Sequence, residues 1–241
     1  MVAITQFSRI PSERQLRRLR WLVILIALAL AALWPARAFQ AEHPLTGRRI
    51  APVMSSGGAD WLERRAREME ENPEGALDAV GIKPGMTVAD VGAGIGYMTL
   101  RVAKRVGPSG TVYANDIQPE MLSQLQNNAA SAKLSNIRTV LGTSTDSKLP
   151  AGQMDLILLV DVYHEFSQPQ KMLRSLREAL KPDGRLVLLE YRKEDPSVPI
   201  RLEHKMSIQE VKTELEAEGF HLGQVIETLP RQHIFVLTRN P

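Results

Sequence analysis

Short apolar runs alternate with segments of helical periodicity from Thr87 to about Tyr191. One run, Met154–Val160 (MDLILLV), is apolar at nearly every position, which is typical of a strand buried on both faces. Strands that alternate with helices form a parallel sheet covered on both sides. We expect strands at Thr87–Val91, Thr111–Asn115, Ile137–Leu141, Met154–Val160 and Arg185–Tyr191, and helices around Gly96–Val106, Pro119–Ala132 and Gln168–Leu180.

The C-terminal part follows a different order. The segment MSIQEVKTELEAEGF predicts a helix, and two strand-like runs follow it, Gly223–Leu229 and His233–Arg239. Only Pro-Arg-Gln separates these runs, and so short a link forces two strands to pair antiparallel. The sequence therefore predicts an α/β, Rossmann-like, doubly wound sheet of seven strands, mostly parallel, with a C-terminal antiparallel hairpin and helices on both faces.

Residues 1–38 resemble a secretory leader. Several arginines precede an apolar run of about 14 residues, WLVILIALALAALW, and Ala36 and Ala38 form an A-x-A pattern after it. A helix that spans a bilayer needs roughly 20 residues. We therefore expect a signal peptide cleaved after Ala38 and a periplasmic or secreted protein, with a retained membrane anchor as the alternative.

The leader also dominates the charge. The chain has a net charge of +3, and the leader contributes +5, so the remaining chain carries −2. We therefore expect no nucleic-acid partner, and membrane contact only through an uncleaved leader. The chain has no cysteine, which excludes disulfides, thiolate metal sites and a catalytic thiolate.

The mature chain is expected to have two parts. Residues 39–59 are rich in Pro, Gly and Ser and predict an N-terminal arm. A domain over residues 60–241 then begins with a helix, for which Asp60 and Glu63 form a plausible capping box. Trp61, Leu62 and Met69 on this helix are expected to make core contacts or to form an apolar lid.

The stretch VADVGAGIGYMTL, Val88 to Leu100, has the composition of a ligand-binding loop. It places an acid, Asp90, and then the glycine series Gly92, Gly94 and Gly96 after an apolar strand. A dinucleotide fingerprint needs G-x-G-x-x-G, and its third glycine position is Tyr97 here. An acid beside the loop suits a cationic ligand better than a pyrophosphate.

Four segments together resemble the class I S-adenosylmethionine-dependent methyltransferases, in the group that methylates small molecules. They are VADVGAGIGY, VYANDIQPEML, DLILLVDVYHEF and LKPDGRLVLLEYR, in the order and spacing of that family. The resemblance runs from about Asp60 to Arg239 and implies S-adenosylmethionine as the cofactor. A non-catalytic binder of S-adenosylmethionine or a related nucleoside stays an alternative, and an NAD(P)-dependent oxidoreductase is less favoured.

The resemblance also implies roles for individual residues. Asp90 faces the methionine ammonium, Gly92, Gly94 and Gly96 let the backbone approach the cofactor, and Asp116 accepts hydrogen bonds from the ribose hydroxyls. Ile117 packs on the adenine, and Asp161 lies near the methionine end of the donor. The family often has Gly-Asp-Ala after the third strand, whereas this chain has Gly-Thr-Ser-Thr-Asp. We expect Asp146 to read the adenine amino group, with Thr143 as the alternative.

The acceptor side is expected to follow the fourth and fifth strands, at the carboxyl edge of the sheet. His164 is the first choice for a general base because its ordinary pKa lies near neutrality, and Glu165 and Tyr191 are the other candidates. A metal site built from His164, Glu165 and His204 is possible, but their spacing alone does not support it. The expected partner is a small-molecule acceptor.

Overall fold

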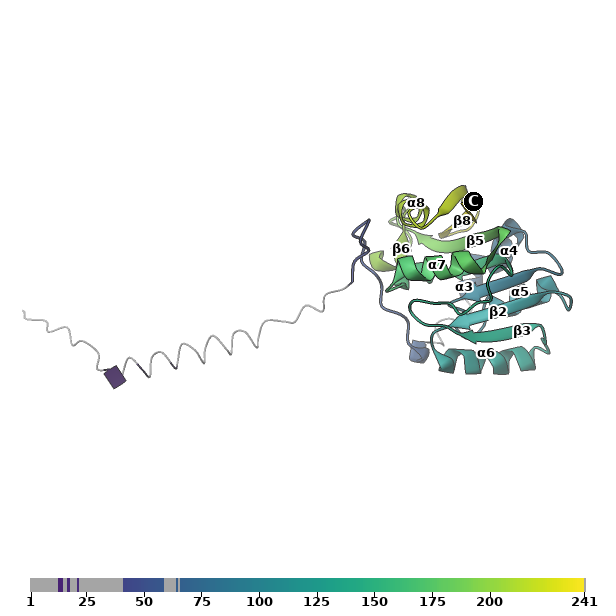
Figure 1. The fold of residues 1–241 in the computed structure, drawn as a ribbon, viewed down its shortest axis with the longest axis horizontal. Coiled ribbons are helices and arrows are strands. Elements are labelled where there is room, and N and C mark those ends of the chain that lie inside the picture. Colours follow the sequence, from purple (N-terminus) through teal and green to yellow (C-terminus); the bar gives the residue numbers. More distant parts are fainter. Residues whose placement is uncertain are drawn as a thin grey trace, which may run out of the picture. The chain divides into compact units, whose positions relative to one another are not determined.

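The structure is a computed structural model that describes residues 41–58, 64 and 66–240, together with the isolated residues 13, 14, 17 and 21. Apart from these four residues, the predicted leader lies outside the described residues, and so do Asp60 and Glu63 of the expected capping box, Trp61 and Leu62. Residues Ala41–Pro241 form one compact unit (Figure 1), so the arm belongs to the same unit as the sheet. In the described part of the chain, no helix combines the length and the apolar character that crossing a membrane requires.

One mixed sheet organises this unit, with strand order β3-β2-β1-β4-β5-β8-β7. β1 pairs in parallel with both β2 and β4, whereas β8 runs antiparallel to β5 and to β7. The strands are β1 (Thr87–Val91), β2 (Thr111–Asp116), β3 (Ile137–Leu141), β4 (Met154–Val160), β5 (Leu180–Arg192), β6 (Lys205–Met206), β7 (Phe220–Ile226) and β8 (Gln232–Arg239). The predicted α/β architecture and the antiparallel C-terminal hairpin are confirmed.

The sheet has eight strands rather than the predicted seven. The additional strand, β6, contributes only Lys205 and Met206, which pair with Tyr191 and Arg192 at the end of β5. Two residues are too few to leave a periodic pattern in the sequence. β7 spans Phe220–Ile226, so it begins and ends three residues before the predicted strand, and its earlier end makes the hairpin connection longer than the three residues expected.

Helices cover both faces of the sheet. They are α3 (Ala66–Glu71), α4 (Pro73–Val80), α5 (Thr99–Val106), α6 (Pro119–Ser131), α7 (Pro169–Ala179) and α8 (Ile208–Glu216), with 3-10 turns η1 (Ser56–Gly58), η2 (Tyr163–Glu165) and η3 (Leu202–His204). Buried side chains of α4 and α5 pack on one face of the sheet, and those of α7 and α8 pack on the other. β4 contributes to both clusters, as its continuous apolar run predicted.

Two helix termini follow directly from the sequence. Asn72 caps α4, since its side chain accepts a hydrogen bond from the Gly75 N–H, and Gly81 ends the helix in the left-handed conformation. Ser207 and Glu210 form a capping box at the start of α8. On α3, Met69 is 80% exposed, so it makes no core contact of the kind expected from the sequence.

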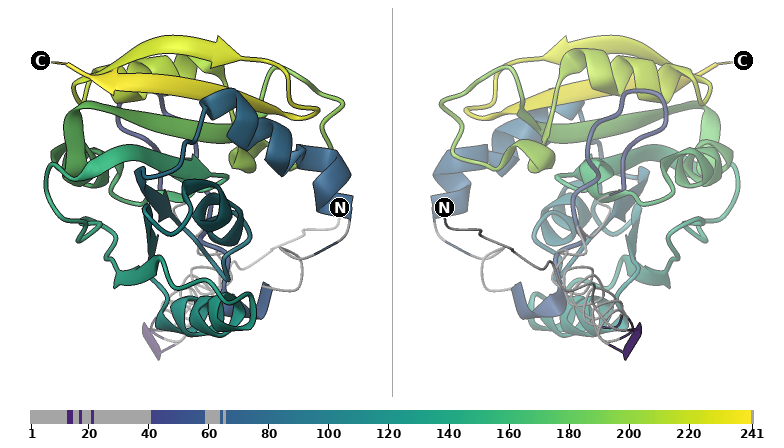
Figure 2. Two further views of the ribbon diagram at one scale, coloured as in Figure 1. Left: turned by 90° about the vertical axis from the view of Figure 1, so that its right-hand side faces the viewer. Right: turned by 90° about the vertical axis from the view of Figure 1, so that its left-hand side faces the viewer.

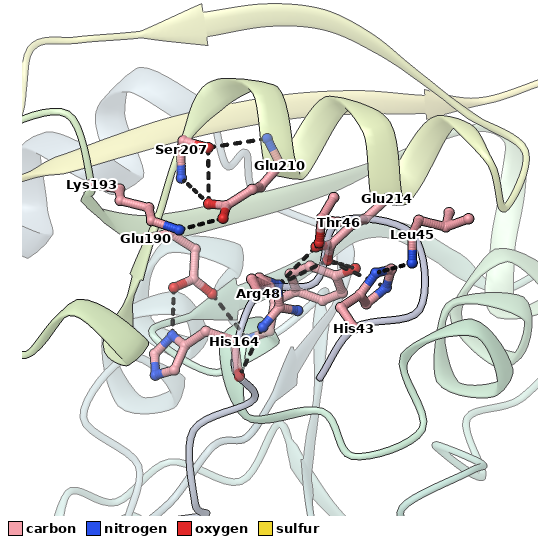
Figure 3. A network of polar contacts seen from close by, with 11 residues as sticks. His43, Leu45, Thr46, Arg48, His164, Glu190, Lys193, Ser207, Glu210 and Glu214 are labelled. Carbon is pink, nitrogen blue, oxygen red and sulfur yellow. Dashed lines mark hydrogen bonds and ion pairs between the residues drawn. The ribbon is translucent and has the colours of Figure 1, made fainter. Parts of the chain in front are cut away.

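The arm is held on the sheet by a buried ion pair. Nε of Arg48 lies 2.9 Å from Oε1 of Glu214 on α8, and Glu214 is fully buried. The same carboxylate also accepts a hydrogen bond from Thr46 (Figure 3) and another from the hydroxyl of Tyr163. The arm passes over the face opposite α4 (Figure 2), and residues 53–54 reach the carboxyl ends of the strands.

Candidate functional site

A cavity of about 470 Å³ opens at the carboxyl ends of β1, β2 and β4. The strand order reverses between β1 and β4, because β2 and β3 lie on one side of this pair and β5 on the other. Open α/β sheets bind ligands at such a point of reversal, where the loops after neighbouring strands diverge. The topology therefore places the cavity where a cofactor is expected.

The glycine loop follows β1 and forms the floor of this cavity. Gly92 has φ of +74°, and a Cβ placed there would lie 2.3 Å from Cγ2 of Val162. Any side chain at this position would therefore collide with the loop after β4. Gly94, with φ of +53°, donates its N–H to Oδ2 of Asp116 over 2.9 Å. The loop thus brings bare backbone to the cavity and fixes the acid at the end of β2.

Asp116 is held in one orientation by backbone amides. Its Oδ1 accepts the N–H of Gln118 over 2.9 Å, and its Oδ2 accepts the N–H of Gly94. Each carboxylate oxygen has two acceptor sites, so both oxygens can still accept hydroxyl donors from a ligand. Burial raises the pKa of Asp116 although these two amides favour its ionised form. Next to it, the apolar side chain of Ile117 is 40% exposed and lines the cavity, so it is available to an apolar ring.

Asp90 supplies a second buried carboxylate. It is the second-last residue of β1, just before the glycines. It is 2% exposed, and its Oδ2 accepts the hydroxyl proton of Thr99 over 2.6 Å. Burial and, as a smaller effect, the nearby Asp116 together raise the pKa of Asp90 to about 6, although the hydrogen bond from Thr99 lowers it. A carboxylate that is ionised at neutral pH but costly to bury is stabilised by a cationic ligand.

Asp161 directly follows β4, and Tyr191 is the second-last residue of β5. Both line the cavity. Asp161 has φ of +53°, which is uncommon for a residue other than glycine, and both its oxygens accept from Nε2 of Gln232 over 2.9 Å. Burial, together with Glu71 and Glu190, raises the pKa of Asp161 well above its ordinary range. The hydroxyl of Tyr191 donates to Oε1 of Glu71 over 2.9 Å, so it is not free to move a proton.

His164 lies in η2, after β4, and also lines the cavity. Its Nδ1 lies 2.6 Å from Oε2 of Glu190, which is fully buried (Figure 3), and its Nε2 lies 3.1 Å from Nδ1 of His204. Burial opposes the charged form of His164, but the Glu190 carboxylate outweighs that effect and raises the pKa of the imidazole. Burial also raises the pKa of Glu165 to about 7.

Two predicted residues lie away from this cavity. Asp146 turns outward, where its carboxylate accepts from Ser175 and forms an ion pair with Lys148, while Thr143 and Ser144 occupy the cavity wall instead. The role expected for Asp146 therefore does not fit its position, because the longer loop after β3 carries it past the wall. Gly96 also stands outside the cavity lining, and its φ of +101° serves the turn into α5.

Some residues of the site were missed by sequence reasoning. Glu190 is the most important, and its signal was available: one glutamate interrupts the apolar run LVLLEYR of β5. Val53 and Met54 of the arm and Arg67 of α3 also line the cavity. Neither the arm nor the start of α3 has a pattern that points to the end of a sheet, so these residues could be placed only by the fold.

Comparison with known proteins identifies the family. A family model described as a methyltransferase domain matches residues 82–229. The chain belongs to the class I S-adenosylmethionine-dependent methyltransferases. A solved structure of a SAM-dependent methyltransferase from Aquifex aeolicus is 29% identical, with a TM-score of 0.73 over 78% of this chain and 100% of that chain.

Two curated relatives of this methyltransferase chain are similar at the same level. Nocamycin O-methyltransferase from Saccharothrix syringae is 31% identical over 140 residues, which cover 58% of this chain and 48% of the relative. The ubiquinone/menaquinone biosynthesis C-methyltransferase UbiE from Vibrio vulnificus is 31% identical over 160 residues, which cover 66% and 58%. The chain thus spans about half the length of the curated relatives it matches.

The cofactor of this methyltransferase family is S-adenosylmethionine, and the residues of the cavity fit it. Its ammonium and sulfonium cations need nearby acidic groups, and the carboxyl groups of Asp90 and Asp161 on the cavity wall could serve them. Its ribose needs a fixed double acceptor, which is the arrangement of Asp116 between two backbone donors. Its adenine needs an apolar surface, which Ile117 offers.

Proposed function

We propose that the protein transfers a methyl group from S-adenosylmethionine to a small-molecule or lipid-like acceptor. One observation supports this most strongly: Asp90 and Asp116, which flank the glycine loop, line the same cavity as His164, Glu165 and Tyr191. We assign the first pair to the donor and the second group, which we call the acceptor end, to the acceptor. The identity of the acceptor and the atom methylated are not fixed by these residues.

Methyl transfer is an in-line displacement at a carbon that the sulfonium already activates, so alignment and exclusion of water provide most of the rate enhancement. The acceptor atom forms a bond to the methyl carbon while the carbon–sulfur bond breaks, and its electron pair stays on sulfur. Val53, Met54, Phe166 and Ile200 line the cavity with apolar surface, which supports an organic acceptor and a dry reaction site.

The relatives support a small organic acceptor but not one kind of target atom. One is named for O-methylation of nocamycin, and the other for C-methylation in ubiquinone and menaquinone biosynthesis. Because their acceptors differ, we extend to this chain only the class of small organic acceptor. No nucleic-acid partner is proposed, since the chain without its leader is slightly acidic.

Incubation with methyl-labelled S-adenosylmethionine and a cell-envelope extract tests the proposal. We expect label in a low-molecular-weight or lipid fraction, and less transfer by Asp116→Ala than by the wild type at a donor concentration that just saturates the wild type. Binding of the donor without any transfer would instead support a non-catalytic binder. An oxidoreductase would change the fluorescence of NAD(P)H, and neither Asp90 beside the loop nor the family favours that outcome.

We also propose that the protein is exported, because the arginine-rich leader and the Ala36-x-Ala38 pattern are typical of a signal peptide. Cleavage near Ala38 predicts a mature chain that begins at Phe39 in the periplasm or outside the cell. Mass spectrometry of the protein from fractionated cells tests this directly. An intact leader in the membrane fraction would indicate the alternative, a membrane anchor.

A further inference from the structure

A cluster of potential metal ligands lies at the acceptor end of the cavity. His164 and Glu165 of η2 and His204 of η3 each place one ligand atom within 4.8 Å of the other two. We propose that these three side chains bind a divalent transition-metal ion. The proposal goes beyond methyl transfer, and only the role of the ion toward the acceptor depends on the proposed function.

The first argument is the orientation of His164. Oε2 of Glu190 lies 2.6 Å from Nδ1, so the proton of a neutral imidazole is held on Nδ1 and Nε2 keeps its lone pair toward the cavity. A buried carboxylate that orients a histidine in this way is the usual support of a metal-binding imidazole. Oε1 of Glu190 is itself fixed, because it accepts the N–H of Tyr163 over 2.9 Å.

The second argument is the approach of His204. Its Nδ1 lies 3.1 Å from Nε2 of His164, and the two rings meet edge to face with centroids 5.1 Å apart. Two imidazole nitrogens this close must share a proton or a cation. Nε2 of His204 lies 3.2 Å from the Arg201 guanidinium, whose side chain is 72% exposed. Metal binding through Nδ1 displaces that contact at little cost, because an exposed contact of this kind contributes little.

The third argument is charge. Asp90, Asp116, Asp161 and Glu165 line the cavity, and Arg67 and Arg201 are the cations that line it within the described residues. Bound S-adenosylmethionine would add positive charge beside Asp90 and Asp161, and part of the negative charge of the cavity would remain for a second cation. A divalent ion there would satisfy Glu165 and both imidazoles together.

The ligand types indicate which ions fit. Two imidazole nitrogens and one carboxylate suit zinc, cobalt, nickel, iron or manganese, whereas magnesium and calcium prefer oxygen ligands. Three protein ligands leave positions open for an acceptor. If the proposed function holds and the acceptor atom is a hydroxyl oxygen, the ion would act as a Lewis acid that lowers the pKa of this hydroxyl, so that its proton passes to water before methyl transfer. The oxygen would then bond the methyl carbon as the carbon–sulfur bond breaks, with that electron pair staying on sulfur, and no general base at Nε2 of His164 would be needed.

Cobalt(II) absorption spectroscopy tests the site. Full-length protein without an affinity tag is freed of metal with a chelator, titrated with Co²⁺, and then competed with Zn²⁺ or Mg²⁺. We expect one equivalent of Co²⁺, displacement by Zn²⁺ and none by Mg²⁺. His204→Ala and Glu165→Gln should each weaken Co²⁺ binding at least about tenfold. His221→Ala, which removes an exposed histidine on β7, is the matched control and should bind as the wild type does.

Absence of a cobalt spectrum, or equal Co²⁺ affinity in the wild type and His204→Ala, would overturn the metal site. Arg201→Ala gives a further check, because removal of a competing cation should strengthen Co²⁺ binding, and weaker binding would count against the site. S-adenosylhomocysteine is titrated into the same samples to separate this proposal from the proposed function. Loss of its binding with an intact cobalt site contradicts only methyl transfer, and the reverse result contradicts only the metal.

Discussion

Oε2 of Glu190 lies 2.6 Å from Nδ1 of His164, and both side chains are buried. This contact decides which imidazole nitrogen faces the cavity. The carboxylate accepts the proton on Nδ1, so Nε2 presents its lone pair to His204 and to the acceptor end. The polarity of that end is therefore set by a residue inside a strand rather than by the loop that carries His164.

Glu190→Gln should reverse this arrangement. The new amide can donate to Nδ1, which favours the tautomer that has its proton on Nε2. We expect Co²⁺ affinity to fall by about 10–100-fold, while S-adenosylhomocysteine binding is retained. Nitrogen NMR of the histidine ring would report the tautomer directly. Glu120→Gln, at an exposed position on α6, is the control, and an unchanged His164 tautomer in Glu190→Gln would contradict the assignment.

Asp116→Ala should weaken S-adenosylmethionine binding by about 1–3 kcal/mol, because the ribose loses charge-assisted hydrogen bonds. Asp146→Ala is the matched comparison, since Asp146 follows the next strand but turns away from the cavity toward Lys148 and Ser175. Calorimetry should give an affinity for Asp146→Ala that equals the wild-type value. A loss of affinity as large as that of Asp116→Ala would restore the role expected from the sequence.

Asp90 should make cofactor binding depend on pH. Its pKa is raised from 3.8 to about 6, and only the ionised form attracts the ammonium and sulfonium groups. Affinity should therefore be level above about pH 7 and fall by up to about tenfold per pH unit below pH 6. Asp90→Asn should bind more weakly at neutral pH and reduce this dependence, and a wild-type profile that stays flat from pH 5 to 8, a range of roughly three units, would contradict the assignment.

The raised pKa of Asp90 also predicts how the stability of the unliganded fold depends on pH, and here the ionised carboxylate is unfavourable rather than favourable. A carboxyl group whose pKa is higher in the folded than in the unfolded chain costs stability as pH rises through that interval, here from 3.8 to about 6. Asp90→Asn should therefore stabilise the unliganded protein at neutral pH, by at most about 3 kcal/mol. Urea unfolding at pH 7.5 (about 1.5 units above that pKa) measures the change. Thr99 keeps a hydrogen-bond acceptor in this variant, so the comparison isolates the charge.

Arg48→Met tests the attachment of the arm. It would leave Glu214 buried without its main cationic partner, which costs about 3–5 kcal/mol in buried pairs. The neighbouring variant Arg49→Met removes an exposed guanidinium and should leave the free energy of unfolding nearly unchanged. Nη1 of Arg48 also donates to the carbonyl of His164 over 3.2 Å, so Arg48→Met should disturb the acceptor end as well. Equal stability of the two variants would mean that the arm contributes little.

Periodicity was sufficient for most of the fold. Strand-like runs such as Met154–Val160 alternate with helical segments, and this order predicted the parallel strands. The short link before His233 predicted the antiparallel pair, and both predictions depend on local patterns. β6 and the attachment of the arm to α8 could not be predicted, because long-range contacts hold them, through Tyr191 and Glu214 respectively.

The candidate site likewise contains residues that could be placed from the sequence and residues that could not. Asp90, Asp116 and Asp161 could be placed at strand ends from the sequence, since the carboxyl edge of a parallel sheet is fixed by topology. The contact of His164 with His204 spans 40 residues and depends on the path of the segment after β5, which has no repeating pattern. Asp146 was misplaced for a related reason, because the direction of a side chain on an irregular loop cannot be derived from its distance to a strand.

Isothermal titration with S-adenosylhomocysteine tests the central claim, recognition of the cofactor by Asp90, Asp116 and the glycine loop, most directly. The neutral thioether keeps the ribose, the adenine and the ammonium, so it requires the same residues without turnover. We predict binding of one molecule per chain, lost or strongly weakened in Asp116→Ala and unchanged in Asp146→Ala. No measurable binding by the folded wild-type protein, or equal binding by all three proteins, would contradict the account.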